Sequence, residues 1–354
     1  MPISHKKLLI LLLPAVLLLS GCSVSLKTGA SEGAVDGGVF KTTNKGETWT
    51  QATRTTLFGG KGLDIRGLDV NVLAIDPSDP RTIYLGSLDN GLFFTYDEGA
   101  DWQVASRVGK IMVSSLAVDP NSKCVIYLSS GNQAYKSVDC GRFWRQAYFD
   151  NDPAVQIRSI AINPLDSGEI FISTSRGEVI KSRDGGETWR TTGRLETDVV
   201  RIIVSPHDPK IIFAGTVDQS IFRSTDGGEN WSSQKEILGE FRDSNSFRDL
   251  VFSLSDPGTV FLANHYGLIK STDYGDSWVN INLITPKEEA IINAIAVSPE
   301  NSGELYYVTA TTFYHSTDGG ANWSSKQLPS SRAGFRLAID PESPNIIYLG
   351  MRKF

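Results

Sequence analysis

The sequence predicts an all-β protein that forms a single seven-bladed β-propeller over residues 37–354, and three observations lead to this prediction. A motif that ends in tryptophan recurs seven times, and a second motif built around a proline alternates with it seven times. Beyond an apolar run near the N-terminus, no segment shows a sustained helical period. Successive motif tryptophans lie 42 to 53 residues apart, which indicates stacked copies of one supersecondary unit.

The first motif has the form Ser/Thr-x-Asp-x-Gly-x-x-Trp and is expected to form a tight turn between two strands. The Asp side chain can accept backbone N–H bonds of its own turn, and the Gly can adopt positive φ without strain. The Trp is large enough to lie between adjacent sheets and to donate its N–H. These are structural roles, at Asn44, Asp97, Asp139, Asp184, Asp226, Asp273 and Asp318 and at Trp49, Trp102, Trp144, Trp189, Trp231, Trp278 and Trp323.

The second motif is an apolar run with a central Ala that ends in Asp/Ser/Asn-Pro, followed after a short turn by an apolar-aromatic pair. One copy is residues 73–77 with Ile83 and Tyr84, and a copy at 251–261 lacks the first proline. Each unit is therefore predicted to have four strands, A to D, with strand A before the proline, strand B at the aromatic residue, strand C before the Asp turn and strand D at the Trp.

The order of the motifs at the two ends predicts how the ring closes. The repeats begin near Gly37 with a C–D pair and stop at Met351 after an A–B pair. Seven complete sheets result only if the two ends join in one blade, which leaves no free sheet edge.

The tryptophan motif resembles the Asp-box, or BNR repeat. Its pairing with the proline motif is similar to sortilin-type (Vps10-like) and xyloglucanase-type propellers, and more loosely to the photosystem II assembly and stability factors. This resemblance covers most of the chain and implies the fold, but it does not determine the function. Sialidases of this kind have six blades and a Phe-Arg-Ile-Pro motif, and here only Asp64-Ile65-Arg66-Gly67 is comparable. Xyloglucanase-type enzymes use two loop aspartates at a cleft between tandem propellers. The repeats of this chain account for a single propeller.

The N-terminus predicts export. Lys6 and Lys7 precede an apolar run of 13 residues, Leu8 to Ser20, that is too short to span a bilayer. The run ends in Leu-Ser-Gly-Cys, which resembles a bacterial lipobox. We therefore expect a lipoprotein signal peptide at 1–21, a lipid on Cys22 and a flexible tether over 22–36. Ser23 then favours the outer membrane if the host is Gram-negative. The alternative is an ordinary secretory signal.

Cys124 and Cys140 are expected to face each other across one hairpin. Cys124 begins strand B and Cys140 follows strand C of the same blade. Antiparallel pairing places both at one end, so a disulfide is expected in an oxidising compartment. The alternative is two unpaired thiols.

Charge and composition exclude several classes of function. The net charge is −6, which disfavours a nucleic-acid partner. Four scattered His and three Cys offer little material for a metal site, and no cofactor motif is found.

Arginines near the start of strand A are the candidate binding residues. In Asp-box propellers the D–A and B–C loops share one face. Here the D–A loops vary in length, so recognition is expected on that face. Arginines that would surround the channel mouth on this face could bind an anion, and they are Arg158, Arg201, Arg248 and Arg336, with Arg66 on a neighbouring loop. The alternative is that acidic residues of the same loops, including Asp198 and Asp249, neutralise them.

The leading functional hypothesis is a lipid-anchored extracytoplasmic propeller without enzymatic activity. It would bind a protein or peptide at the D–A and B–C loop face, or assist assembly of a membrane complex, and no catalytic residue is assigned. The alternative is a carbohydrate-active protein, either a glycoside hydrolase of sialidase or xyloglucanase type or a glycan-binding module.

Overall fold

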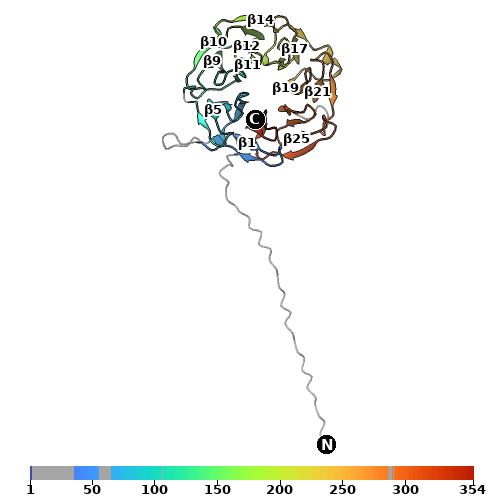
Figure 1. Ribbon diagram of the computed structural model, residues 1–354. Helices are drawn as coiled ribbons and strands as arrows, with labels where there is room; N and C mark the ends of the chain where they lie inside the picture. Colours follow the sequence, from blue (N-terminus) through green and yellow to red (C-terminus); the bar gives the residue numbers. More distant parts are fainter. Residues whose placement is uncertain (2–35, 56–64, 106, 286–288, 290) are drawn as a thin grey trace. The chain divides into compact units, whose positions relative to one another are not determined.

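The computed structural model describes Met1 and residues 36–55, 65–105, 107–285, 289 and 291–354. Within these residues, seven four-stranded antiparallel sheets lie in a ring, which confirms the predicted seven-bladed propeller (Figure 1). Apart from Met1, the predicted signal peptide at 1–21 lies outside the described residues, as do the lipid site at Cys22 and nearly all of the tether.

Six blades are each made of four consecutive strands. The first three are β3 (Val70–Ile75), β4 (Ile83–Ser87), β5 (Leu92–Thr95) and β6 (Gln103–Val104); β7 (Ser115–Val118), β8 (Ile126–Ser130), β9 (Gln133–Ser137) and β10 (Arg145–Phe149); and β11 (Ile157–Asn163), β12 (Asp166–Thr174), β13 (Glu178–Ser182) and β14 (Arg190–Arg194). The next three are β15 (Val199–Val204), β16 (Ile212–Thr216), β17 (Ile221–Ser224) and β18 (Ser232–Ser233); β19 (Phe247–Phe252), β20 (Val260–Asn264), β21 (Leu268–Ser271) and β22 (Val279–Ile281); and β23 (Ala294–Val297), β24 (Leu305–Val308), β25 (Thr312–Ser316) and β26 (Ser324–Gln327). The first strand of each blade is innermost, as β11 and β14 show at the two sides of one blade in Figure 1.

The seventh blade joins the two ends of the repeat region. β27 (Ala333–Ile339) and β28 (Ile347–Arg352) supply its inner half, and β1 (Val39–Thr42) and β2 (Thr50–Gln51) supply its outer half. β1 pairs antiparallel with β28 from Val39 opposite Gly350 to Thr42 opposite Ile347. The predicted closure is confirmed, and a backbone bond from the Met351 N–H to the Gly38 carbonyl extends it.

The Asp turns have the geometry that their residue types predict. In the turn after β17, the Ser224 hydroxyl donates to the Asp226 carboxylate at 2.8 Å and accepts the Gly228 N–H at 2.8 Å. The same carboxylate accepts the Asn230 N–H at 2.9 Å. Gly228 has φ +81°, and a Cβ there would lie 2.8 Å from the Phe171 ring of the preceding blade, so both backbone conformation and space require glycine.

Three motif tryptophans form hydrogen bonds to the preceding blade. Trp102, Trp189 and Trp323 each donate their indole N–H at 2.8 Å to a carbonyl in or just after the outermost strand of that blade. Trp102 is fully buried. These residues therefore connect blades through both packing and hydrogen bonds.

The hydrophobic core lies between the blades. One cluster joins Val39 and Tyr348 of the closing blade to Val70, Ile83 and Phe93 of the next. Every residue of the second strand is buried in β4, β16 and β20. This explains why strand B reads as continuous apolar sequence rather than as alternation.

Helices are scarce in the described part of the chain. It contains two 3₁₀ turns, η1 (Ile65–Gly67) and η2 (Ile237–Glu240). No helix among the described residues has the length and apolar character to cross a membrane. Cys124 and Cys140 form a disulfide at one end of the β8–β9 hairpin.

Candidate functional site at the mouth of the central channel

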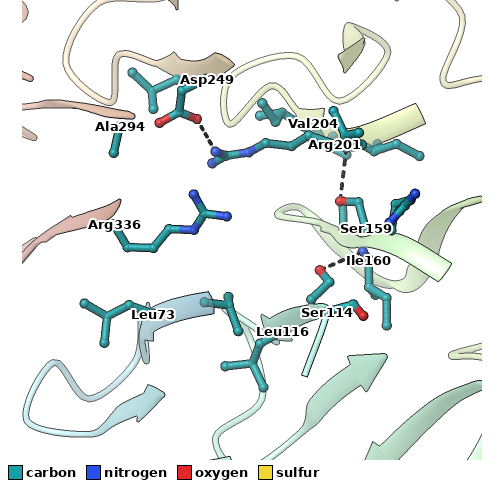
Figure 2. Close-up of a pocket in the computed structure, with 18 of the residues that line it drawn as sticks. Leu73, Ser114, Leu116, Ser159, Ile160, Arg201, Val204, Asp249, Ala294 and Arg336 are labelled. Atoms are coloured by element: carbon teal, nitrogen blue, oxygen red, sulfur yellow. Dashed lines mark hydrogen bonds and ion pairs between the residues drawn. The ribbon is translucent and has the colours of Figure 1, made fainter. Parts of the chain in front are cut away.

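Seven side chains at one equivalent position line the half of the central channel nearer to the D–A loops. Each directly precedes the apolar-Ala-apolar run of its inner strand or the matching run, and we call them the channel ring: Val72, Ser115, Ser159, Arg201, Asp249, Ala294 and Arg336. They enclose a hollow of about 380 Å³, within the usual size of ligand pockets (Figure 2). Polar groups from different blades therefore meet at one place.

β-Bulges decide which of the predicted arginines belong to this ring. The register of β11 shifts between Ile157 and Ser159, and that of β19 shifts between Phe247 and Asp249, so Arg158 and Arg248 are the extra residues. A bulged residue leaves the strict alternation of the strand. Arg201 and Arg336 follow the bulges of β15 and β27 and lie on the ring.

Arg201 and Asp249 form an ion pair between neighbouring blades inside the channel (Figure 2). The buried Asp249 carboxylate also accepts the Leu250 N–H at 2.9 Å and the Ile295 N–H, from a third blade, at 3.0 Å. This carboxylate is held by three inner strands, which fixes its position without mobile loops.

Arg158 lines the same hollow and is neutralised by Asp198 from the loop before β15. Its guanidinium Nε donates at 3.0 and 3.1 Å to the two carboxylate oxygens, and a second nitrogen donates at 2.6 Å. The sequence analysis gave neutralisation of the arginines by nearby acidic residues as its alternative. This alternative is correct for Arg158 and Arg201.

Arg336 differs from these two because no ion pair engages it among the described residues. Its Nε donates to the Asn71 carbonyl at 2.9 Å, and its guanidinium stacks 4.1 Å from the centre of the Phe335 ring. Burial, together with the nearby positive charge of Arg201, lowers the pKa of Arg336 to about 10.

Two serine hydroxyls of the ring connect inner strands. The Ser115 hydroxyl accepts the Ile160 N–H at 3.0 Å, and the Ser159 hydroxyl accepts the Ile202 N–H at 3.1 Å. Each hydroxyl keeps its own proton available for donation to a ligand.

Three of the five predicted binding arginines line the hollow, and two do not. Arg158, Arg201 and Arg336 come together at the channel, whereas Arg248 and Arg66 are exposed and do not line the hollow. Sequence reasoning treated Asp249 as a neutralising loop residue and missed its place on the ring. Alignment of the seven strands on the first apolar residue would have revealed that place.

The opposite end of the inner strands is apolar. A second hollow of about 390 Å³ there is lined by Leu254 and by the strand-ending prolines Pro77, Pro120, Pro164 and Pro341. Polar recognition in the channel is therefore concentrated at the loop end. In the described part of the chain, no cluster of three or more metal-ligating side chains is found.

The aromatic side chains that could serve as sugar platforms are partly used in packing. Phe241 is buried, and its ring centre lies 5.2 Å from that of Tyr266. Tyr148 packs 5.6 Å from the ring of Trp189. A broad aromatic platform is not formed by these three residues.

A family model described as the BNR/Asp-box repeat matches residues 222–233. These residues run from β17 through the Asp turn whose geometry is described above. The chain carries Asp-box repeats on a seven-bladed propeller.

Curated relatives that match in sequence are xyloglucanases. Xyloglucanase Xgh74A of Acetivibrio thermocellus is 29% identical over 155 residues, which is 44% of this chain and 16% of the relative. A xyloglucanase of Paenibacillus sp is 27% identical over 194 residues, covering 43% of this chain and 18% of the relative. The chain thus matches less than one fifth of the length of these relatives.

Solved structures share the fold at low sequence identity. The GH74 enzyme of Niastella koreensis superposes with a TM-score of 0.63 at 18% identity, covering 85% of this chain and 53% of that one. The structure of YCF48 bound to D1 peptide gives a TM-score of 0.61 at 15% identity, covering 80% and 92%. The loose resemblance to photosystem II factors therefore has a structural counterpart.

The leading functional hypothesis from the sequence, a non-enzymatic protein-binding or assembly scaffold, is wrong. The sequence matches are to xyloglucanases, and GH74 enzymes recur among the structural neighbours. These findings favour the alternative, a carbohydrate-active protein. The sequence alone could not show the polar channel mouth, because this mouth forms only where the inner strands of several blades meet.

Proposed function

We propose that this chain is a carbohydrate-active propeller of the glycoside hydrolase type and that its substrate is a polysaccharide of the xyloglucan class. The observation that carries the proposal is the 155-residue stretch that is 29% identical to a xyloglucanase. The polar channel mouth supports it, because carboxylate, guanidinium and hydroxyl groups are the partners that sugar hydroxyls require.

Hydrolysis of a glycosidic bond ordinarily needs two carboxyl groups on either side of that bond, one of which donates a proton. Asp249 and Asp198 at the channel are both bonded to arginines, so they suit substrate positioning better than proton donation. The proposal therefore assigns them to binding and names no catalytic pair.

Affinity electrophoresis in gels containing xyloglucan tests the proposal. We expect retarded migration in xyloglucan gels and none in gels containing an unrelated neutral mannan. Release of reducing ends from the same xyloglucan then measures hydrolysis. Unchanged migration together with no release of reducing ends would overturn the proposal.

We further propose that the protein is exported and lipid-anchored through Cys22. The support is the basic, apolar and Leu-Ser-Gly-Cys order of the N-terminus. Cys22→Ala should move the protein from the membrane fraction to the soluble extracytoplasmic fraction. Retention of this variant in the membrane fraction would exclude the anchor.

A further inference from the structure

The channel mouth holds more positive charge than its carboxylates neutralise. Arg158, Arg201 and Arg336 line the hollow, and the first two are paired with Asp198 and Asp249. Figure 2 shows Arg336 extending into the hollow toward the Arg201–Asp249 pair. One guanidinium is thus left without a counter-charge among the described residues.

A second arginine that forms no ion pair among the described residues lies behind the first. Arg352, on β28, stacks 4.4 Å from the same Phe335 ring and donates to the Asn71 side chain at 3.2 Å. The described residues form no ion pair with it, and its buried Nε has no hydrogen-bond partner there. Two like charges in contact with one aromatic ring repel each other, so a bound anion would stabilise this arrangement.

The walls of the hollow indicate the rest of the ligand. The Ser114 hydroxyl lines it and is buried without a hydrogen-bond partner among the described residues, which costs free energy unless a ligand pairs with it. Ser115 and Ser159 can each donate a proton. Between these polar groups lie Leu73 and Ile160, which suit the C–H face of a compact ring.

We propose that the central channel is a binding site for a compact hydroxylated carboxylate, the chemistry of a uronic acid sugar, with Arg336 as its carboxylate-binding residue. A monoanion matches the single unpaired guanidinium that reaches the hollow, and a planar carboxylate matches its forked donors. The inference goes beyond the proposed function and does not rest on it, because xyloglucan carries no carboxylate.

Isothermal titration of the full chain with D-galacturonate and D-galactose tests the inference. We expect galacturonate to bind at least about tenfold more tightly than galactose, because hydrogen bonds to charged groups contribute more than neutral ones. Equal affinity for the two sugars, or phosphate binding as tightly as galacturonate, would overturn the inference.

Variants assign the effect to the residue. Arg336→Gln should reduce galacturonate affinity to that for galactose, and Arg336→Lys should give an intermediate value because it keeps the charge but loses the fork. Arg248→Gln, which changes an exposed arginine outside the hollow, is the matched control and should bind as the wild type does. Unchanged galacturonate binding by Arg336→Gln would contradict the assignment.

Two further measurements separate the sources of the ligand and the two proposals. Trigalacturonate that binds more tightly than the monomer would support recognition of a chain end, and equal affinity would support a free sugar acid. Because Arg336→Gln removes a buried unpaired charge, its thermal stability should equal or exceed that of the wild type, but galacturonate should no longer raise it. Xyloglucan retardation measured on the same sample reports the proposed function separately.

Discussion

In several Asp turns, the second glycine packs directly against the blade before it. Gly320 has φ +89°, and a Cβ there would overlap the Ile281 side chain of the preceding blade. The adjacent Gly319 has φ +74°, but a Cβ there meets nothing within 4 Å. Substitution of Gly319 would therefore introduce backbone strain alone, whereas substitution of Gly320 would introduce both backbone strain and steric overlap.

We predict that Gly320→Ala destabilises the protein more than Gly319→Ala. The left-handed conformation costs about 1–2 kcal/mol in either variant, and overpacking adds about 1–3 kcal/mol at Gly320 alone. Urea unfolding of both variants measures the difference. Equal losses would show that the blade contact at Gly320 contributes nothing.

The carboxylates of the Asp turns give the fold a dependence on acid pH. Hydrogen bonds from the Thr188 hydroxyl and N–H, and from the Ser182 hydroxyl, lower the pKa of Asp184 to about 2. An unfolded Asp titrates near 3.9. The stabilisation is therefore complete above about pH 4 and is lost as pH falls toward about 2, since the unfolded chain binds protons first.

We predict that Asp184→Asn reduces the loss of folding stability that the wild type shows as the pH falls from about 4 to about 2. The variant should be less stable than the wild type at pH 7, and the gap should close toward pH 2. It should still fold, because Asn44 occupies the same position in the closing blade and accepts the Thr48 N–H at 2.9 Å. Urea midpoints across pH, with Glu300→Gln as an exposed control, provide the test, and a gap independent of pH would refute it.

At the scale of elements, the inner strands are joined through side chains rather than through a continuous ladder. Asp249, on β19, is one such side chain. It forms an ion pair with Arg201 of β15 and accepts the Ile295 N–H of β23, so it connects three strands. Removal of the Asp249 carboxylate would leave the buried N–H groups of Leu250 and Ile295 without their acceptor. The Arg201 side chain, which is 38% exposed, would be rehydrated at lower cost.

We predict that Asp249→Ala lowers the free energy of unfolding by about 1–3 kcal/mol, because two buried N–H groups lose their acceptor. Arg248→Ala changes the neighbouring exposed residue and should stay within about 0.5 kcal/mol of the wild type. Chemical denaturation compares them directly, and similar values for both variants would mean that the Asp249 contacts do not hold the blades together.

Sequence patterns predicted the elements better than the site. The tryptophan and proline motifs were sufficient to count the blades and to predict that the chain ends share one blade. Each motif forms a turn whose conformation depends on its own residues, so it can be recognised without knowledge of the rest of the fold. The bulges in β11 and β19 were not predictable, since they depend on pairing across strands, and a shift of one residue decides whether Arg158 or Ser159 lies on the ring. Ion pairs between blades, such as that of Arg201 and Asp249, need the ring itself.

At the scale of the whole molecule, the ring places its recognition groups at one end. The loop end of the channel is polar and charged, and the other end is lined by prolines. The Asp turns lie at the proline end and have structural roles. A carbohydrate ligand is therefore expected to contact the D–A and B–C loops and the channel ring.

Hydrogen–deuterium exchange with and without xyloglucan oligosaccharide is the measurement that tests this account most directly. The account predicts slower exchange in the loop-end segments 150–156, 195–198 and 264–268 and no change in the Asp turns, such as 224–231. Absence of any protection, or protection confined to the Asp turns, would contradict it.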